Sequence, residues 1–140
     1  YGIVGLAKAM DLAYEDVVGH QIHVQELKSY MMGRLENELG SINYHGETNQ
    51  EKSLYTVLNV QLPATSKAGM LLFTLDLKGV AASGGSACTS GAAKGSHVLE
   101  GICADMSRPN VRFSFSRFTT KEEIDFAVEA LLQIYDKILV

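Results

Sequence analysis

The chain has 140 residues, of which 46% are hydrophobic and 20% are charged, a composition typical of one folded domain and unlike that of a disordered chain. Its 12 Lys and Arg residues are outnumbered by 16 Asp and Glu residues, which gives a formal net charge of −4. Nucleic-acid binding as the main function therefore has little support. No apolar run approaches the ~18 residues that a membrane-spanning helix needs, and we expect no signal peptide.

The cysteines and histidines are too sparse to form a scaffold or a metal centre. Cys88 and Cys103 are too few for a disulfide framework and are not grouped as a zinc site. His20, His23 and His45 share no spacing with other ligand types, so we expect no metal. Free cysteines of this kind indicate a reducing compartment, and we expect a cytoplasmic protein whose partners include neither nucleic acid nor membrane.

The first quarter of the chain has helical spacing that starts without a cap. Helices commonly begin after Ser, Thr, Asp or Asn, so an apolar pattern that opens at Tyr1 favours a piece of a longer polypeptide over a processed terminus. We expect a helix over residues 3–39, bent near Gly19 and ended by a left-handed Gly40. Its apolar positions are Ile3, Leu6, Met10, Ala13 and Val17, then Val24, Leu27, Met31, Leu35 and Leu39.

The middle of the chain alternates between short strand patterns and short helix patterns. Period-two alternation predicts strands, and glycine or proline marks where each element ends. In chain order we expect a strand over 54–62 ended by Pro63, a helix over 66–78 closed by Gly79, a small strand over 80–82, a loop rich in Gly, Ser and Ala over 83–95, and a helix from Ser96 to about Ala104.

The last third of the chain carries the clearest pattern. Apolar residues alternate with polar ones after Pro109, which predicts a strand with one apolar face: Val111, Phe113 and Phe115 against Arg112, Ser114 and Ser116. Thr120 and Glu123 form a capping box ahead of a helical stripe of Ile124, Ala127, Val128, Leu131, Tyr135 and Ile138. We therefore expect an α+β fold, in which helices cover one face of a small, mostly antiparallel sheet.

The two cysteines have different surroundings in the sequence. Cys88 lies in SGGSACTSG, among glycines and serines that cannot bury it, so a reactive thiol is favoured over a bystander. Nothing next to it in sequence would lower its pKa from the ordinary value of about 8.5, since Lys94 and His97 are six and nine residues away. Cys103 follows Ile102 on a predicted helix, and we expect a buried core thiol there.

Arg112 is the second candidate for a functional residue. Its position in the strand places it opposite Val111 and Phe113, and its planar guanidinium suits a carboxylate or a phosphate. A solvated charge on an open sheet face is an equally good interpretation of the residue alone. Arg108 and Arg117 are expected to be surface charges, and the loop glycines match no phosphate-binding motif.

Three motifs together carry a family resemblance. They are GIVGLAKAMDLA from Gly2, SGGSACTSG from Ser83, and RPNVRFSFSRFTTKEEID from Arg108. In this order and spacing the chain resembles, from end to end, the C-terminal region of cysteine desulfurases of the class V aminotransferase family. The resemblance implies the aspartate-aminotransferase fold, pyridoxal phosphate as cofactor and a role in iron–sulfur cluster assembly. The SACTS loop is similar to that of the branch with a long cysteine loop.

That resemblance assigns roles to two residues. Cys88 would be the nucleophile that takes sulfur from L-cysteine and holds it as a persulfide, and Arg112 would bind the substrate α-carboxylate. A sulfur-acceptor or scaffold protein would receive the sulfur, and the parent enzyme would be a homodimer. The electron-sink chemistry would belong to pyridoxal phosphate itself.

The chain also departs from the family pattern. No lysine has the context of the cofactor-binding lysine, although the chain has lysines at Lys8, Lys28, Lys52, Lys67, Lys78, Lys94, Lys121 and Lys137. We therefore expect residues 1–140 to be the small domain, with residues from about 1 to 20 ending a helix from an absent large domain, and we expect no bound pyridoxal phosphate and no activity from this chain alone. The alternatives are a piece of another class V aminotransferase or selenocysteine lyase, and a stand-alone module that carries a persulfide.

Overall fold

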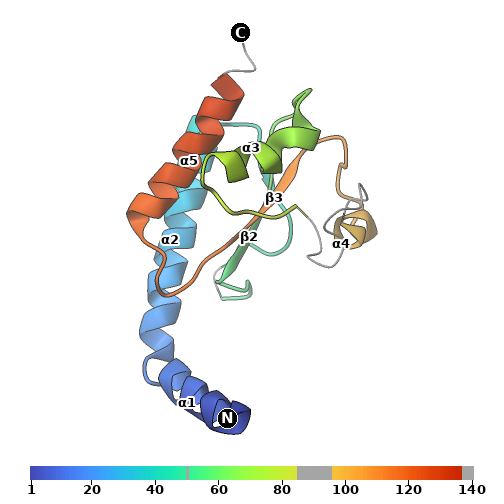
Figure 1. The fold of residues 1–140 in the computed structure, drawn as a ribbon. Coiled ribbons are helices and arrows are strands. Elements are labelled where there is room, and N and C mark those ends of the chain that lie inside the picture. Colours follow the sequence, from blue (N-terminus) through green and yellow to red (C-terminus); the bar gives the residue numbers. More distant parts are fainter. Residues whose placement is uncertain (50, 85–95, 137–140) are drawn as a thin grey trace.

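The computed structural model describes residues 1–49, 51–84 and 96–136, and these residues form a small α+β unit (Figure 1). Short helices and strands alternate between two long N-terminal helices and one long C-terminal helix. The elements are α1 (Gly2–Tyr14), α2 (Val17–Glu38), β1 (Asn43–Tyr44), β2 (Val57–Gln61), the 3-10 helix η1 (Ala68–Met70), α3 (Leu71–Leu77), α4 (His97–Gly101), β3 (Asn110–Ser114) and α5 (Lys121–Asp136).

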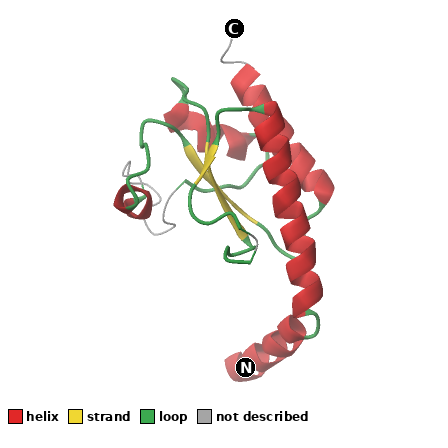
Figure 2. Ribbon diagram, turned by 180° about the vertical axis from the view of Figure 1, so that it is seen from behind, coloured by secondary structure: helices red, strands yellow, loops and turns green. Residues whose placement is uncertain are grey.

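The three strands form one antiparallel sheet in the order β1-β2-β3. In the central pair, Leu58 lies opposite Phe113 and Val60 lies opposite Val111. Helices α2 and α5 lie side by side along one side of the sheet, whereas α4 lies on the other side (Figures 1 and 2). The expected α+β architecture, with helices over one face of an antiparallel sheet, is confirmed.

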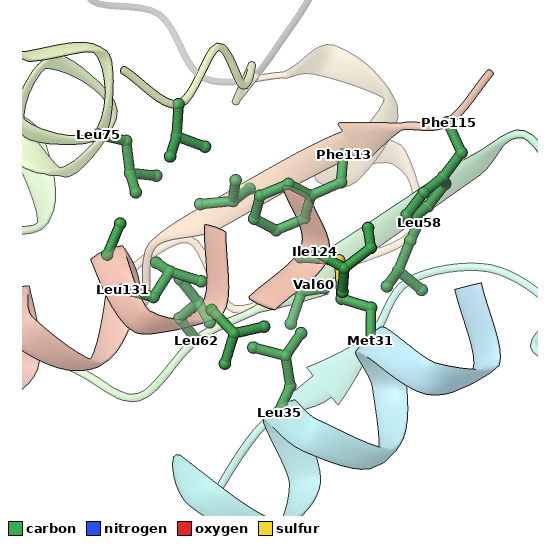
Figure 3. Packing of buried hydrophobic residues seen from close by; sticks show 14 of the residues in the cluster. Met31, Leu35, Leu58, Val60, Leu62, Leu75, Phe113, Phe115, Ile124 and Leu131 are labelled. Carbon is green, nitrogen blue, oxygen red and sulfur yellow. The ribbon is translucent and has the colours of Figure 1, made fainter. Parts of the chain in front are cut away.

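The core lies between the sheet and the helices (Figure 3). Period-two alternation sends the apolar residues of β2 and β3 to one face, and the apolar stripes of α2 and α5 pack onto that face. The residues labelled there are Met31 and Leu35 from α2, Leu58 and Val60 from β2, Leu75 from α3, Phe113 and Phe115 from the β3 segment, and Ile124 and Leu131 from α5, together with Leu62. Burial of this apolar surface is the main force that holds the sheet to its helices.

Polar contacts tie α2 to α5 at the edge of this core. The Tyr30 hydroxyl donates to Asp125 Oδ1 at 2.6 Å, and Arg34 Nη1 donates to the same oxygen at 2.8 Å. The hydrogen bond from Tyr30, followed by that from Arg34, lowers the pKa of the Asp125 carboxyl. Arg34 also pairs with Glu38 one turn along α2. These contacts join the two long helices beside the core.

The long N-terminal helix is broken rather than bent, and the break lies before Gly19. Asp16 leaves the helical conformation, with φ −149° and ψ 55°, and its side chain accepts the Gly19 N–H at 3.0 Å. Asp16 is therefore the N-cap that starts α2. Gly19 matters because a Cβ at this position would collide with the Asp16 carboxylate. The expected bend near Gly19 is thus corrected to a break at residues 15–16, created by a cap inside the apolar pattern.

The ends of the other long helices follow the sequence signals. Gly40 has φ +56° and ends α2, and Gly79 has φ +85° after α3, so both adopt the left-handed conformation that glycine tolerates. The capping box at α5 is confirmed, because the Thr120 N–H donates to Glu123 Oε2 at 3.0 Å and the Glu123 N–H donates to Thr120 Oγ1 at 3.3 Å. Ile138 lies outside the described residues.

Several short elements differ from the prediction. The strand expected over 54–62 contains only Val57–Gln61, and Leu54 is 64% exposed. No strand forms over 80–82, and pairing is limited to a single bridge at Ser83. The helix expected over 66–78 is divided into η1 and α3, and the one expected from Ser96 to about Ala104 is the shorter α4. Most of the loop expected over 83–95 lies outside the described residues.

Helix α1 has apolar residues that the described part of the chain does not bury. Ile3 is 87% exposed, and no residue of α1 is buried. The helix projects from the end of α2 away from the sheet (Figures 1 and 2). Its length and its hydropathy, like those of the other described helices, do not meet the requirements for crossing a membrane.

Candidate functional site

Arg112 lies on β3 and points to the face of the sheet that the core does not use. Its neighbours Val111 and Phe113 are buried on the inner face, and Arg112 itself is half-buried on the outer face. Within the described ranges, no hydrogen bond or ion pair engages its guanidinium. Because this group carries five N–H donors, it can bind an anion that reaches the outer face. The predicted placement of Arg112 is confirmed.

A backbone bridge joins Arg112 to the start of the cysteine-bearing segment. The Ser83 N–H donates to the Arg112 carbonyl at 3.2 Å, and the Arg112 N–H donates to the Ser83 carbonyl at 2.5 Å. Gly84 follows at a crowded position, where a Cβ would lie 2.7 Å from Leu72 Cδ1 and 3.1 Å from the Asn110 carbonyl oxygen. The segment that leads to Cys88 therefore leaves the sheet directly beside Arg112.

Four residues form a row across the outer face, which we call the polar row: Ser83, Arg112, Asn59 and His45. Ser83 bridges Arg112, Arg112 lies opposite Asn59 on β2, and the His45 N–H donates to the Asn59 carbonyl at 3.0 Å just beyond β1. Residues paired across antiparallel strands present their side chains on the same face. The polar row therefore gathers a cation, an amide and an imidazole from segments that are far apart in sequence.

A second layer of hydrogen bonds closes one side of the polar row. His45 Nε2 lies 2.7 Å from Asn110 Oδ1, and Asn110 Nδ2 donates to the Arg108 carbonyl at 3.0 Å. Since the Asn110 amide nitrogen is occupied as a donor, its oxygen is the acceptor, and His45 Nε2 must carry the proton. Gln61 is buried next to this pair and donates to the Asp105 carbonyl at 2.9 Å.

The other two arginines near the site have different surroundings. Arg108 was expected at the surface, but it is half-buried, donates from Nε to the Leu62 carbonyl at 3.0 Å and donates from Nη2 to the Ser41 carbonyl. It is a structural clamp between the ends of two strands, which corrects the expectation. Arg117 is exposed, as expected, and stacks over the Phe118 ring with its Cζ 4.7 Å from the ring centroid.

The two cysteines cannot be compared within this structure, because Cys88 lies outside the described residues. Cys103 can be placed, and the expectation of a buried core thiol is wrong. It is exposed and has φ +55°, immediately after α4, where its N–H donates to the Glu100 carbonyl at 3.0 Å. A helix usually ends in this left-handed conformation at glycine. Here the conformation turns the Cys103 side chain away from the core.

Two of the histidines have structural partners. His23 Nε2 lies 3.0 Å from the Thr119 carbonyl, and His45 contacts Asn110, whereas His20 lies at the start of α2. In the part of the chain that the structure describes, no three His, Cys, Asp or Glu side chains gather closely enough to hold a metal ion.

Lys28 is a buried charge that the sequence analysis did not single out. It is only 7% exposed, and its Nζ donates to Ser53 Oγ at 2.6 Å and to the Leu54 carbonyl at 3.0 Å. Burial lowers the pKa of this ammonium group. The signal was available, because Lys28 follows Val24 by four residues and precedes Met31 by three, within the buried stripe of α2.

Comparison with known proteins identifies the family. The profile described as aminotransferase class-V matches residues 1–126. The chain belongs to this family. The predicted family membership is therefore confirmed, and the polar row lies within the matched residues.

Curated class-V relatives are similar over nearly the whole chain. The cysteine desulfurase IscS of Rickettsia felis is 32% identical over 138 residues, which cover 97% of this chain and 32% of that protein. The cysteine desulfurase IscS of Colwellia psychrerythraea is 35% identical over 131 residues, which cover 92% of this chain and 31% of that protein. The chain thus spans about a third of the length of these relatives.

Solved structures show the same fold. A structure described as a NifS-like protein matches with a TM-score of 0.75 and 28% identity, covering 96% of this chain and 33% of that one. The apo structure of a cysteine desulfurase from Thermococcus onnurineus matches with a TM-score of 0.74 over 97% of this chain and 31% of that one. At 17% identity, the second match supports the fold alone.

Proposed function

We propose that this chain is the small C-terminal domain of a cysteine desulfurase. The proposal is supported by the class-V match over residues 1–126 and by relatives that carry this name at 32% and 35% identity. Residues from about 1 to 20 would end a helix that links the chain to a larger domain. The exposed apolar residues of α1 support this division, because a second domain would cover them.

The single observation that carries the chemical proposal is the bridge between Ser83 and Arg112. It joins the start of the motif that carries Cys88 to the strand that carries Arg112, and the proposed reaction gives these two residues separate roles. Cys88 follows Ser83 by five residues, and five residues of extended chain span at most about 18 Å. A thiol on this tether and a carboxylate anchor at Arg112 can therefore serve one substrate molecule.

The proposed net reaction converts L-cysteine and the Cys88 thiol into L-alanine and a Cys88 persulfide. The carbon–sulfur bond of the substrate breaks, a sulfur–sulfur bond forms at Cys88, and the substrate carbon takes up a proton. The carbon is reduced while the sulfur atoms are oxidised, so the step needs no external oxidant. An acceptor protein, such as one that assembles iron–sulfur clusters, would then take the sulfur, and the parent enzyme would act as a homodimer.

Arg112 would bind the α-carboxylate of L-cysteine. Its fork of N–H groups matches a carboxylate through two parallel hydrogen bonds, and β3 holds the residue on the open face. A substrate held by its carboxylate has its amino group and its sulfur in defined directions, which lowers the entropic cost of reaction.

The described lysines do not fit the pyridoxal phosphate site of such an enzyme. Lys28 is buried, but its ammonium group is held by Ser53 and the Leu54 carbonyl, and Lys78 donates to Gln133 at the surface. The others in the described ranges are exposed: Lys8, Lys52, Lys67 and Lys121. When bound, this cofactor supplies an electron sink. We assign its binding to the part of the parent enzyme outside this chain.

The test uses the parent enzyme with its cofactor and compares two cysteine variants. Cys88→Ser should lower alanine formation from L-cysteine by about 100-fold or more, because the sulfur acceptor is lost. Cys103→Ser should leave the rate unchanged, since Cys103 is exposed beside α4. Peptide mass spectrometry after one turnover should find one added sulfur atom on the Cys88 peptide. Full activity in Cys88→Ser, or no alanine from the unmodified enzyme, would refute the proposal.

A further inference from the structure

One polar atom on the outer face of the sheet lacks the partner that its burial requires. Asn59 Oδ1 has no contact with solvent and accepts no hydrogen bond from the residues that the structure describes. Buried side-chain oxygens in folded proteins are nearly always hydrogen-bonded, because an unpaired one forfeits the bonds that it made to water. An orphaned acceptor of this kind indicates a donor that reaches Asn59 in another state of the protein.

The strand register places Arg112 directly opposite Asn59. The backbone N–H and carbonyl of Arg112 bond to Ser83, and the Asn59 carbonyl accepts the His45 N–H. The backbone polar groups of Arg112 and Asn59 therefore point away from each other, although the two residues are paired in the sheet. Asn59 and Arg112 therefore form a non-hydrogen-bonded pair, the arrangement in which facing Cα atoms come closest, at about 4.5 Å. Their side chains share the outer face at the shortest separation that a sheet permits.

The other polar neighbours of Asn59 are already committed. His45 Nε2 donates to Asn110, the Asn110 amide donates to the Arg108 carbonyl, and the Gln61 amide donates to the Asp105 carbonyl. In the described part of the chain, the guanidinium of Arg112 is the neighbouring donor group that makes no hydrogen bond. The unused acceptor and the unused donors thus belong to residues that face each other across the two strands.

We propose that Asn59 is the positioning residue of the carboxylate anchor. In the complete enzyme, one N–H of the Arg112 guanidinium donates to Asn59 Oδ1, and two others remain in parallel for the substrate carboxylate. This role rests on the proposed function, because it assumes that Arg112 binds L-cysteine. It requires three of the five N–H groups of arginine and gives the buried acceptor its donor.

The contact has a direct consequence for substrate binding. An unrestrained arginine side chain samples many rotamers, and binding a carboxylate bidentately must restrict them. A hydrogen bond from the guanidinium to a fixed amide on the neighbouring strand restricts them beforehand. Loss of Asn59 Oδ1 should therefore raise the KM for L-cysteine while kcat changes little.

The experiment is a double-mutant cycle in the parent enzyme with its cofactor. Asn59→Leu, which replaces the amide with an apolar group of similar size, should raise the KM for L-cysteine by about tenfold, the effect of one hydrogen bond to a charged group. In an Arg112→Lys background, the same substitution should raise KM by less than about twofold, because the geometry that Asn59 supports is already lost. Asn43→Leu, on the same face but one residue pair away, is the matched control and should leave KM unchanged.

A purely structural Asn59 would give different results. Asn59→Leu would then lower the melting temperature, change kcat as much as KM, and have the same effect in both backgrounds; any of these outcomes overturns the proposal. If Asn59→Leu does not fold, Asn59→Ser removes the amide oxygen with a smaller perturbation and is judged by the same criteria. If the unmodified enzyme forms no alanine, the proposed function fails, and this inference falls with it. Alanine formation with an unchanged KM in Asn59→Leu refutes this inference alone.

Discussion

The two faces of the small sheet use the same strands in opposite ways. The inner face carries Leu58, Val60, Val111 and Phe113, all of them buried under α2 and α5 (Figure 3). The outer face alternates with them and carries the polar row, in which Arg112 and Asn59 have no side-chain partner among the described residues. One face is therefore fixed by packing, while the other is held in register and remains available to a ligand.

This difference shows how the domain separates stability from chemistry. Shortening a side chain on the inner face lowers the free energy of unfolding of the protein, because the substitution leaves a cavity. The outer face can change its side chains at small cost to the fold, because the strands are positioned from the other side. Substitutions on the two faces should therefore affect different measurements.

The largest expected effect is on the inner face. Phe113→Ala should lower the free energy of unfolding by about 3–5 kcal/mol, because a buried aromatic ring is removed from the centre of the core. Urea denaturation followed by circular dichroism measures this loss. Phe118→Ala is the control, since that ring is 74% exposed, and it should change stability by less than about 0.5 kcal/mol. Similar losses in both variants would contradict the assignment of the inner face.

The corresponding test of the outer face measures activity. Arg112→Lys in the parent enzyme should raise the KM for L-cysteine and lower kcat/KM by about 100-fold, because lysine cannot form two parallel hydrogen bonds to a carboxylate. The melting temperature of the variant should stay within about 1–2 °C of that of the unmodified enzyme, because the substitution lies outside the core. Arg117→Lys, exposed and stacked on Phe118, should be nearly silent. Equal losses in the two variants would show that the anchor lies elsewhere.

The smallest expected effect concerns the helices that cover the inner face. Hydrogen bonds from Tyr30 and Arg34 lower the pKa of Asp125, so its carboxylate stabilises the fold fully above the unfolded value of about 3.9. This stabilisation is lost as the pH falls through the lower folded pKa. Asp125→Asn should therefore flatten the acid part of a plot of stability against pH. Glu129→Gln, an exposed change on the same helix, should leave the plot unaltered; an equal change in both would refute the role of Asp125.

The sequence predicted the elements whose signals are local. The alternation of Val111, Phe113 and Phe115, the capping box of Thr120 and Glu123, and the left-handed Gly40 were all confirmed, because each depends on residues a few positions apart. The class V family was predicted from motifs, and the match over residues 1–126 confirmed it. Arg112 was placed correctly on the outer face for the same reason, since strand alternation is a local rule.

The remaining features depend on partners that are distant in sequence. Arg108 was expected to be a surface charge, yet its Nε donates a hydrogen bond to the Leu62 carbonyl, 46 residues away in sequence. Cys103 was expected in the core because Ile102 precedes it, but the end of α4 turns it outward. Asn59 was not recognised at all, because its significance appears only when β3 lies beside it.

The bridge between Ser83 and Arg112 consists entirely of main-chain hydrogen bonds. Such bonds are indifferent to side-chain identity, and at position 83 only proline lacks the N–H that Arg112 requires. Position 83 can therefore change its side chain while the bridge, and with it the place of the strand that carries Arg112, stays the same.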